Sequence, residues 1–561
     1  MSEKMKQPVR GNTNQTLYIV LKAGFLISLI PIIVLAFFNY PAADDLSAGD
    51  TAYWAWRDTG SILEVVKAAW ENVEYNYENW SGVFASVFWT SLQPGIFGER
   101  FYGMTTVITV LLLLLGGFSL GKTLGREYLK ADWYTLGCIV LLYLFTTIHL
   151  MPNGNEGLFW HAGVANYTWG FAFLLLLLGE ILSLQKEQKE AKRMVKLIKA
   201  CVLAVLVGGG NYITALQGTL WLGMLTVFFC FADGRKASRD RMKIASADGR
   251  KASRDRLKTA FADEKKADKD TTKTRIRQSP IKLVLKKNWP VILCTLVVIA
   301  AFAASVLAPG NAVRMGMSEG MGPVEAILQS FVYSIRFPVK EWTRWPVIAL
   351  LLVAIPLMWD IADRMQFGFS CPAAVVALAY CLVSAGFTPS LYAQGSVEAG
   401  RLQDTVYFLY ILALYASAFY LVGWINRCYR KMQVEKAAVE EKHQTGKSTK
   451  ETMGRKIGKK LTWILLACFI LASGIHLSIN RNLYIGTEAA VVLLSGQAKI
   501  YRQENEERLQ LLKDSTVKDV AVKPFSDPPK LLLFQDISFD SGEWINTVVA
   551  EYYGKESVKV E

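Results

Sequence analysis

The sequence predicts an all-α integral membrane protein with about eleven transmembrane helices, interfacial amphipathic helices and a small extracytoplasmic C-terminal tail. Of the 561 residues 52% are hydrophobic, and apolar runs of roughly 20 residues, enough to cross a bilayer, recur as far as residue 478. A secretory signal would supply only one such run. The net charge of +14 comes from Lys and Arg concentrated between the runs, which is the positive-inside pattern. This distribution indicates a membrane protein, and we expect no nucleic-acid partner.

The first apolar run, Leu17 to Phe38, follows Lys4, Lys6 and Arg10. Positive residues before a span place the N-terminus in the cytoplasm, so the loop 39–100 should lie outside. Apolar residues recur at helical spacing from Ile62 to Trp70 and again from Phe84 to Phe88, which predicts amphipathic helices in the headgroup region.

The remaining spans alternate across the membrane and leave each basic loop on the cytoplasmic side. They are expected at about 101–120, 134–150, 165–184, a short segment ending at 208, 212–232, 289–307, 345–359, 373–387, 406–425 and 461–477. The chain thus divides into an N-terminal membrane module (1–231), a basic cytoplasmic linker (232–287), a C-terminal membrane module (288–478) and an extracytoplasmic tail (479–561).

Two of these segments have patterns of their own. The linker contains a repeat that begins at Ala232, recurs at Ala247 and decays in a copy at Ala262, which predicts a partly helical or disordered cytoplasmic segment. The tail shows helical polarity over 501–513 and a β-rich run at 531–534, which predicts a helix and a strand.

The predicted topology gathers chemically capable residues on the outer face. They are the adjacent acids Asp44 and Asp45, His161, Arg314, Arg401 and several aromatic residues. A carboxylate can act as general base towards a hydroxyl, and a guanidinium fork matches phosphate oxygens. Tyr and Trp offer flat faces suited to sugar rings. Together these residue types indicate transfer of a group from a lipid-linked phosphate.

Each of these residues also has an ordinary structural interpretation. The two acids can cap the helix that contains Tyr53, and Trp80 can simply pack at the interface. His161 can hydrogen-bond within its loop, and the arginines can bind lipid headgroups without specificity. The chain has no GxxxxGK[ST], HExxH or CxxC motif, so its sequence gives no indication of a P-loop ATPase or a zinc protease.

Several short motifs carry a resemblance. They are Asp44-Asp45 after the first span, Asn79-Trp80-Ser81-Gly82, Trp160-His161-Ala162-Gly163 with Asn166-Tyr167-Thr168, Pro309-Gly310-Asn311 with Arg314, and in the tail Trp544-Ile545-Asn546 with Tyr552-Tyr553-Gly554. In these motifs the chain resembles a family of bacterial multi-span membrane proteins that is similar to the GT-C glycosyltransferases, which use polyprenyl-phosphate-linked sugars. The resemblance covers nearly the whole chain except 232–272. One departure is Val83, where members often have a basic residue.

The resemblance implies a GT-C-like fold, with Asp44 or Asp45 as catalytic base or as ligand of a divalent cation. It also implies Arg314 and Arg401 as contacts of the donor phosphate. Substrate-binding residues are accordingly predicted in the motifs and the Arg401 loop: Trp80, Trp160, His161, Asn166, Tyr167, Asn311, Arg314 and Arg401.

Two functions remain as the main hypotheses, beside a third in which the chain is a structural or sensory membrane protein that acts through its outer tail. The first is a glycosyltransferase at the outer face of the bacterial cytoplasmic membrane, with a polyprenyl-phosphate-linked sugar as donor and an envelope glycan or lipid as acceptor. The second is a non-catalytic protein that binds or transports polyprenyl-linked or envelope lipids. It needs the arginines and aromatic residues but not the acids.

Overall fold

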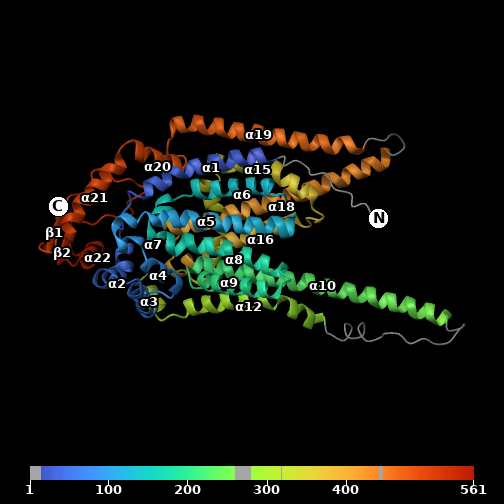
Figure 1. The fold of residues 1–561 in the computed structure, drawn as a ribbon, viewed down its shortest axis with the longest axis horizontal. Helices are drawn as coiled ribbons and strands as arrows, with labels where there is room; N and C mark the ends of the chain where they lie inside the picture. Colours follow the sequence, from blue (N-terminus) through green and yellow to red (C-terminus); the bar gives the residue numbers. More distant parts are fainter. Residues whose placement is uncertain (1–13, 259–279, 318, 441–446) are drawn as a thin grey trace.

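A computed structural model of the protein describes residues 14–258, 280–317, 319–440 and 447–561 (Figure 1). These residues are mostly helical, and their only two strands are four residues long. The predicted all-α class is therefore confirmed for the described part of the chain.

Nine helical segments in the described ranges are long and apolar enough to cross a membrane. In chain order these segments overlap α1 (Gln15–Ala36), α5 (Met104–Thr123), α8 (Trp169–Lys186), α10 (Tyr212–Lys258), α12 (Pro280–Val306), α15 (Trp345–Arg364), α16 (Pro372–Ala385), α18 (Gly400–Glu440) and α19 (Lys447–Ile479). Leu, Ile, Val and Phe dominate these segments, and burying their apolar side chains in lipid or against other helices is what drives insertion. The chain is a multi-pass membrane protein.

Two further helices coincide with predicted spans but differ from these nine. α6 (Trp133–His149) has 17 residues, and α9 (Glu190–Gly208) has a basic first half that contains Lys192 and Arg193. α6 packs against α1, α5 and α15, while α9 packs between α8 and α12. Both helices therefore belong to the bundle.

One end of the bundle carries the shorter elements (Figure 1). The loop after α1 folds into α2 (Asp44–Thr59), α3 (Ile62–Asn79) and α4 (Phe84–Ser91), and the tail contributes α20 (Ile485–Leu494), α21 (Gln497–Lys513), α22 (Trp544–Tyr553), β1 (Asp519–Val522) and β2 (Ser557–Val560). Short helices α7 (His161–Gly163), α13 (Gly310–Met315), α14 (Pro323–Phe337) and α17 (Thr388–Gln394) connect the spans. The apolar side chains Ile62, Leu63 and Trp70 of α3 are exposed, as expected for an interfacial helix.

The tail is part of the body of the molecule, because it packs against the loop after α1. Tyr552 stacks on Tyr53 of α2 with ring centroids 4.2 Å apart, and Lys513 Nζ lies 2.7 Å from Glu99 Oε2. β1 and β2 pair in parallel, with Val520 opposite Val558. These contacts join the beginning and the end of the chain on one side of the bundle.

The expected strand at 531–534 is wrong, since this segment forms turns. Two prolines, Pro528 and Pro529, precede it; they lack N–H donors, and the carbonyl of Pro529 closes a turn by accepting from Leu532 N at 2.9 Å. Leu531 and Leu532 are nevertheless buried, because they pack against the membrane bundle. Burial here reflects tertiary docking and not a sheet.

The linker begins as a continuous extension of α10. That helix has 47 residues, and at 1.5 Å each it is about 70 Å long, far beyond the hydrocarbon thickness. The repeat copies that begin at Ala232 and Ala247 lie in this helix, whereas the copy at Ala262 lies outside the described residues.

Candidate functional site

The two candidate acids occupy the first turn of α2, directly after a strained residue. Ala43 has φ 51° and ψ −123°, a backbone conformation that favours glycine and costs an alanine on the order of 1–3 kcal/mol. The surrounding chain holds this bend: Asn39 Nδ2 donates to Phe159 O at 2.9 Å, and Trp160 Nε1 donates to Ala42 O at 3.1 Å. Negative charge at a helix N-terminus is favoured by the helix dipole.

Asp45 is completely buried, and both of its carboxylate oxygens are used inside the protein. Oδ1 accepts from Ala162 N at 2.7 Å, and Oδ2 accepts from Tyr102 Oη at 2.5 Å and from Ala42 N at 3.1 Å. Burial raises the pKa of Asp45 from 3.8 to about 7, against the lowering effect of these three donors. Asp45 therefore fastens α2 to α7 and to Tyr102, which precedes α5, instead of capping its own helix.

His161 is equally committed to the interior. Its Nε2 lies 3.0 Å from Trp89 O and its Nδ1 lies 3.1 Å from Thr105 Oγ1. A carbonyl only accepts, so Nε2 carries the proton and Nδ1 accepts from the threonine hydroxyl. The backbone N of His161 donates to Tyr102 Oη at 2.9 Å, which links it to Asp45. His161 is therefore a neutral residue that helps to position Tyr102 and, through it, Asp45. Neither of its ring nitrogens is free to bind a substrate.

Asp44 differs from its neighbour, because its carboxylate has no hydrogen bond or ion pair within the described residues and is partly exposed. Burial raises the pKa of the Asp44 carboxyl above its ordinary value, while the positive charges of Arg401 and Arg314 lower it. Asp44 is therefore a carboxylate with free oxygens that lies within the electrostatic reach of two cations.

Arg401 comes from the first turn of α18 and is held from two sides. Glu156 Oε2 accepts from its Nη1 at 3.0 Å and from its backbone N at 3.1 Å. The guanidinium lies over the rings of Trp160 (5.2 Å to the centroid) and Tyr167 (5.9 Å). An arginine positioned in this way still has donors for a phosphate, because one carboxylate oxygen does not satisfy all five N–H groups.

Trp160 joins the membrane bundle to the tail. Its ring stacks on Phe534 with centroids 3.7 Å apart and planes within 7°, and the tryptophan itself is buried. Since Arg401 also lies over this ring, the tail residue helps to fix the position of the cation. Phe534 was not predicted, because nothing local in the tail indicates its distant partner.

Arg314 approaches from α13, over the ring of the exposed Trp80 at 5.8 Å from its centroid. Asn311 builds this corner: its Oδ1 accepts from Gly82 N at 3.2 Å and from Tyr212 Oη at 2.5 Å, and its Nδ2 donates to carbonyls of α12. Asn311 is therefore a structural junction, whereas Arg314 and Trp80 remain available to a ligand.

The close approach at this corner requires glycine. A Cβ on Gly82 would lie 1.9 Å from Ser305 O, and one on Gly310 would lie 2.4 Å from Trp80 N. The Trp-Ser-Gly motif thus packs backbone against backbone on α12 and α13.

The structure brings together Asp44, Arg401, Trp160 and Tyr167, with Arg314 and Trp80 at the neighbouring corner. Asp45, His161 and Asn311 support them from behind. Asn166 is also structural in this arrangement, because its Nδ2 donates to Ala162 O and its carbonyl accepts from Asn211. Sequence reasoning missed Tyr102, Glu156 and Phe534.

A divalent cation at this site would have Asp44 as its carboxylate ligand, since the Asp45 oxygens are already engaged. Among the described residues no group of three or more His, Cys, Asp or Glu side chains is arranged to hold a metal.

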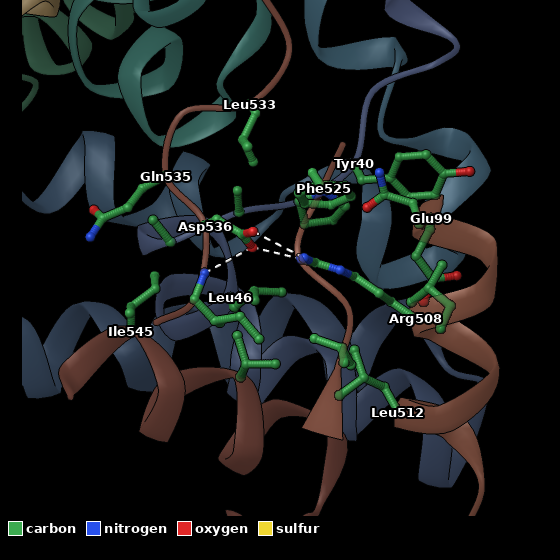
Figure 2. Close-up of a pocket in the computed structure, with 18 of the residues that line it drawn as sticks. Tyr40, Leu46, Glu99, Arg508, Leu512, Phe525, Leu533, Gln535, Asp536 and Ile545 are labelled. Carbon is green, nitrogen blue, oxygen red and sulfur yellow. Dashed lines mark hydrogen bonds and ion pairs between the residues drawn. The ribbon is translucent and has the colours of Figure 1, made fainter. Parts of the chain in front are cut away.

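A cavity of about 80 Å³ lies beside the acids, between the loop after α1 and the tail (Figure 2). Ala42, Ala43 and Leu46 line one wall, and Phe525 and Arg508 line another. Arg508 is paired with both oxygens of Asp536 at 2.6 and 3.0 Å and lies over the Phe525 ring at 3.6 Å. With its charges already paired, this cavity is part of the interface that holds the tail.

Comparison with known proteins gives no match of this chain to a family model, to a curated protein or to a solved structure.

Proposed function

We propose that this protein is a membrane glycosyltransferase, which transfers a sugar from a polyprenyl-phosphate donor to an envelope glycan or lipid acceptor at the outer face of the bacterial cytoplasmic membrane. One observation carries the proposal. The Asp44 carboxylate has no hydrogen-bond or ion-pair partner within the described residues and lies at the end of a membrane span. The positive charges of Arg401 and Arg314 are close enough to lower its pKa. The resemblance in sequence motifs points to the same chemistry.

In the proposed reaction, an Asp44 oxygen takes the proton of the acceptor hydroxyl as that oxygen attacks the anomeric carbon of the donor sugar. The bond between the anomeric carbon and the phosphate oxygen breaks, and polyprenyl phosphate leaves with the bonding electrons. Arg401 and Arg314 stabilise the charge that develops on the phosphate. The raised pKa of Asp44 makes it a stronger base than an exposed carboxylate.

The other residues of the site have supporting tasks in this scheme. Glu156 fixes the Arg401 fork, so that less conformational freedom is lost when a phosphate binds. Trp80 and Tyr167 offer ring faces to the sugar or the isoprenoid chain.

The proposal is tested with Asp44→Asn, Asp44→Glu and, as matched control, Asp50→Asn. Asp50 is an acid of the same helix whose Oδ1 accepts from Trp54 Nε1 at 3.1 Å. Envelope glycans are compared by mass spectrometry in a deletion strain complemented with each variant at equal membrane level. We expect Asp44→Asn to give the glycan profile of the deletion strain, Asp44→Glu to restore part of the product and Asp50→Asn to restore it fully. A wild-type profile with Asp44→Asn would refute a base at this position.

The non-catalytic alternative predicts another pattern. Binding of a polyprenyl-phosphate sugar to the purified protein would then depend on Arg401 and Arg314, survive Asp44→Asn, and lead to no sugar transfer even with the wild-type chain. The arginines and aromatic faces favour lipid-phosphate binding in either case, and only the free carboxylate distinguishes catalysis.

A further inference from the structure

A second site lies at the opposite end of the bundle, in the turn between α5 and α6. α5 begins next to Tyr102, whose hydroxyl binds Asp45, and reaches this turn after 20 residues. At 1.5 Å per residue that is about 30 Å, the thickness of the hydrocarbon core. An open cavity of about 390 Å³ lies beside this turn, at the end of the bundle opposite to Asp44.

Three cationic side chains line this cavity, together with an aromatic residue and an apolar floor. The lining residues are Lys122, Arg126, Lys130, Ala131, Trp133 and Leu136. Lys122 and Lys130 have no side-chain hydrogen bond or ion pair with any described residue, and Arg126 has only an exposed contact of 3.6 Å with Glu127. The cavity therefore contains a concentrated and largely uncompensated positive charge.

The nearby acid Asp132 does not neutralise this charge. Its Oδ2 accepts from Arg364 Nη1 at 3.1 Å and from Thr135 Oγ1 at 2.8 Å, and its Oδ1 accepts from Thr135 N at 2.9 Å. Asp132 thus caps α6 and pairs with Arg364, so it does not bind the cations of the cavity. A further cation, Lys186, lies over the Tyr128 ring close to the turn.

The backbone of the turn is specifically shaped. Residues Leu124–Leu129 form a π-helical turn, and Lys130 follows with φ 48° in the left-handed region. Gly125 packs so closely on Leu136 that a Cβ would lie 2.1 Å from its side chain, and its carbonyl accepts from Ala131 N at 3.0 Å. This geometry folds the chain back and directs the basic residues around the apolar floor.

We propose that this cavity binds the headgroup of an anionic phospholipid. Lysine and arginine provide the charge and hydrogen-bond donors for the phosphate, and Trp133, which is 39% exposed at the start of α6, is suited to the headgroup region. The apolar side chains of Ala131 and Leu136 contact the first carbons of the acyl chains. Basic pockets of this kind between membrane helices take anionic headgroups. The site is independent of the proposed transferase activity.

The test compares two charge-matched triple variants of the full chain. Lys122→Gln/Arg126→Gln/Lys130→Gln removes the cations of the cavity. Lys192→Gln/Lys282→Gln/Lys286→Gln removes three exposed charges from the start of α9 and α12, at the same end of the bundle. Delipidated protein in neutral detergent is titrated with phosphatidylglycerol, phosphatidylcholine or inorganic phosphate, and bound lipid is counted by native mass spectrometry.

We expect wild type and the α9/α12 control to bind phosphatidylglycerol with equal affinity and to prefer it over phosphatidylcholine. The cavity variant should bind it about 100-fold more weakly, which corresponds to about 1 kcal/mol for each of three charges. Equal binding by the cavity variant, or an equal loss in the control, would overturn the site. Full competition by millimolar inorganic phosphate would overturn the lipid assignment.

Discussion

Replacing Asp45 by asparagine should destabilise the protein by about 1–3 kcal/mol at pH 5.5, although the two side chains have the same shape. Three donors converge on the carboxylate: Tyr102 Oη and the backbone N–H groups of Ala42 and Ala162. An amide has one accepting oxygen. If that oxygen faces Tyr102 and Ala42, the amide NH₂ meets Ala162 N; if it faces Ala162, the NH₂ meets Ala42 N. Either orientation leaves a buried donor without an acceptor, which gives the stated cost.

The low pH matters, because the pKa of about 7 makes Asp45 mostly protonated there, and the comparison is then between two neutral side chains. Unfolding in detergent, followed by tryptophan fluorescence against denaturant, measures the difference. Asp44→Asn is the matched control and should stay within about 0.5 kcal/mol of wild type, since its carboxylate accepts no hydrogen bond from a described residue. Equal stability of the two asparagine variants would refute the assignment of Asp45 as the structural acid and Asp44 as the free one.

Three further outcomes follow from the same contacts. The folded state raises the pKa of Asp45 from 3.8 to about 7 and therefore binds the proton more tightly than the unfolded chain. The unfolding free energy should fall by up to about 4 kcal/mol as the pH rises from 4 to 7 and should level off above pH 7. In Asp45→Asn this pH dependence should disappear. Gly82→Ala should lower the yield of folded protein because its Cβ would overlap a backbone carbonyl of α12, whereas Gly223→Ala, with nothing within 4 Å, should be tolerated; equal yields in size-exclusion chromatography would contradict the close packing. Phe534→Ala should weaken docking of the tail by about 0.5–1.5 kcal/mol for the lost stacking alone and speed limited proteolysis of the tail, with Phe534→Leu intermediate; unchanged proteolysis would contradict the role of the stack.

The membrane helices could be predicted because each depends on its own composition. The first span was expected at Leu17–Phe38 and is found at Gln15–Ala36. The short span expected to end at 208 coincides with helix α9, which is not among the nine candidate spans of the described residues. The interfacial helices of the loop were visible for the same reason. The expected strand at 531–534 failed because its apolar residues serve docking to the bundle, and a single sequence does not separate these two causes of burial.

For the site, sequence reasoning could propose residue types but not their division of labour. Asp44 and Asp45 are adjacent and chemically identical, and only the position of Tyr102 and α7 makes one a buried anchor and leaves the other free. Glu156 and Phe534 have no distinguishing local pattern. Glu156 matters because it binds Arg401, and Phe534 matters because it stacks on Trp160. Each of these partners is far away in the sequence.

The stack of Trp160 on Phe534 also bears on how the protein is made. Asp44 follows the first membrane helix, whereas Phe534 follows α19, the last one described. During synthesis the acid reaches its side of the membrane long before the ring that completes the wall around Arg401. The centre can therefore assemble only after the segment beyond α19 has been synthesised and has docked, so that a chain arrested earlier would contain the acid without a finished site.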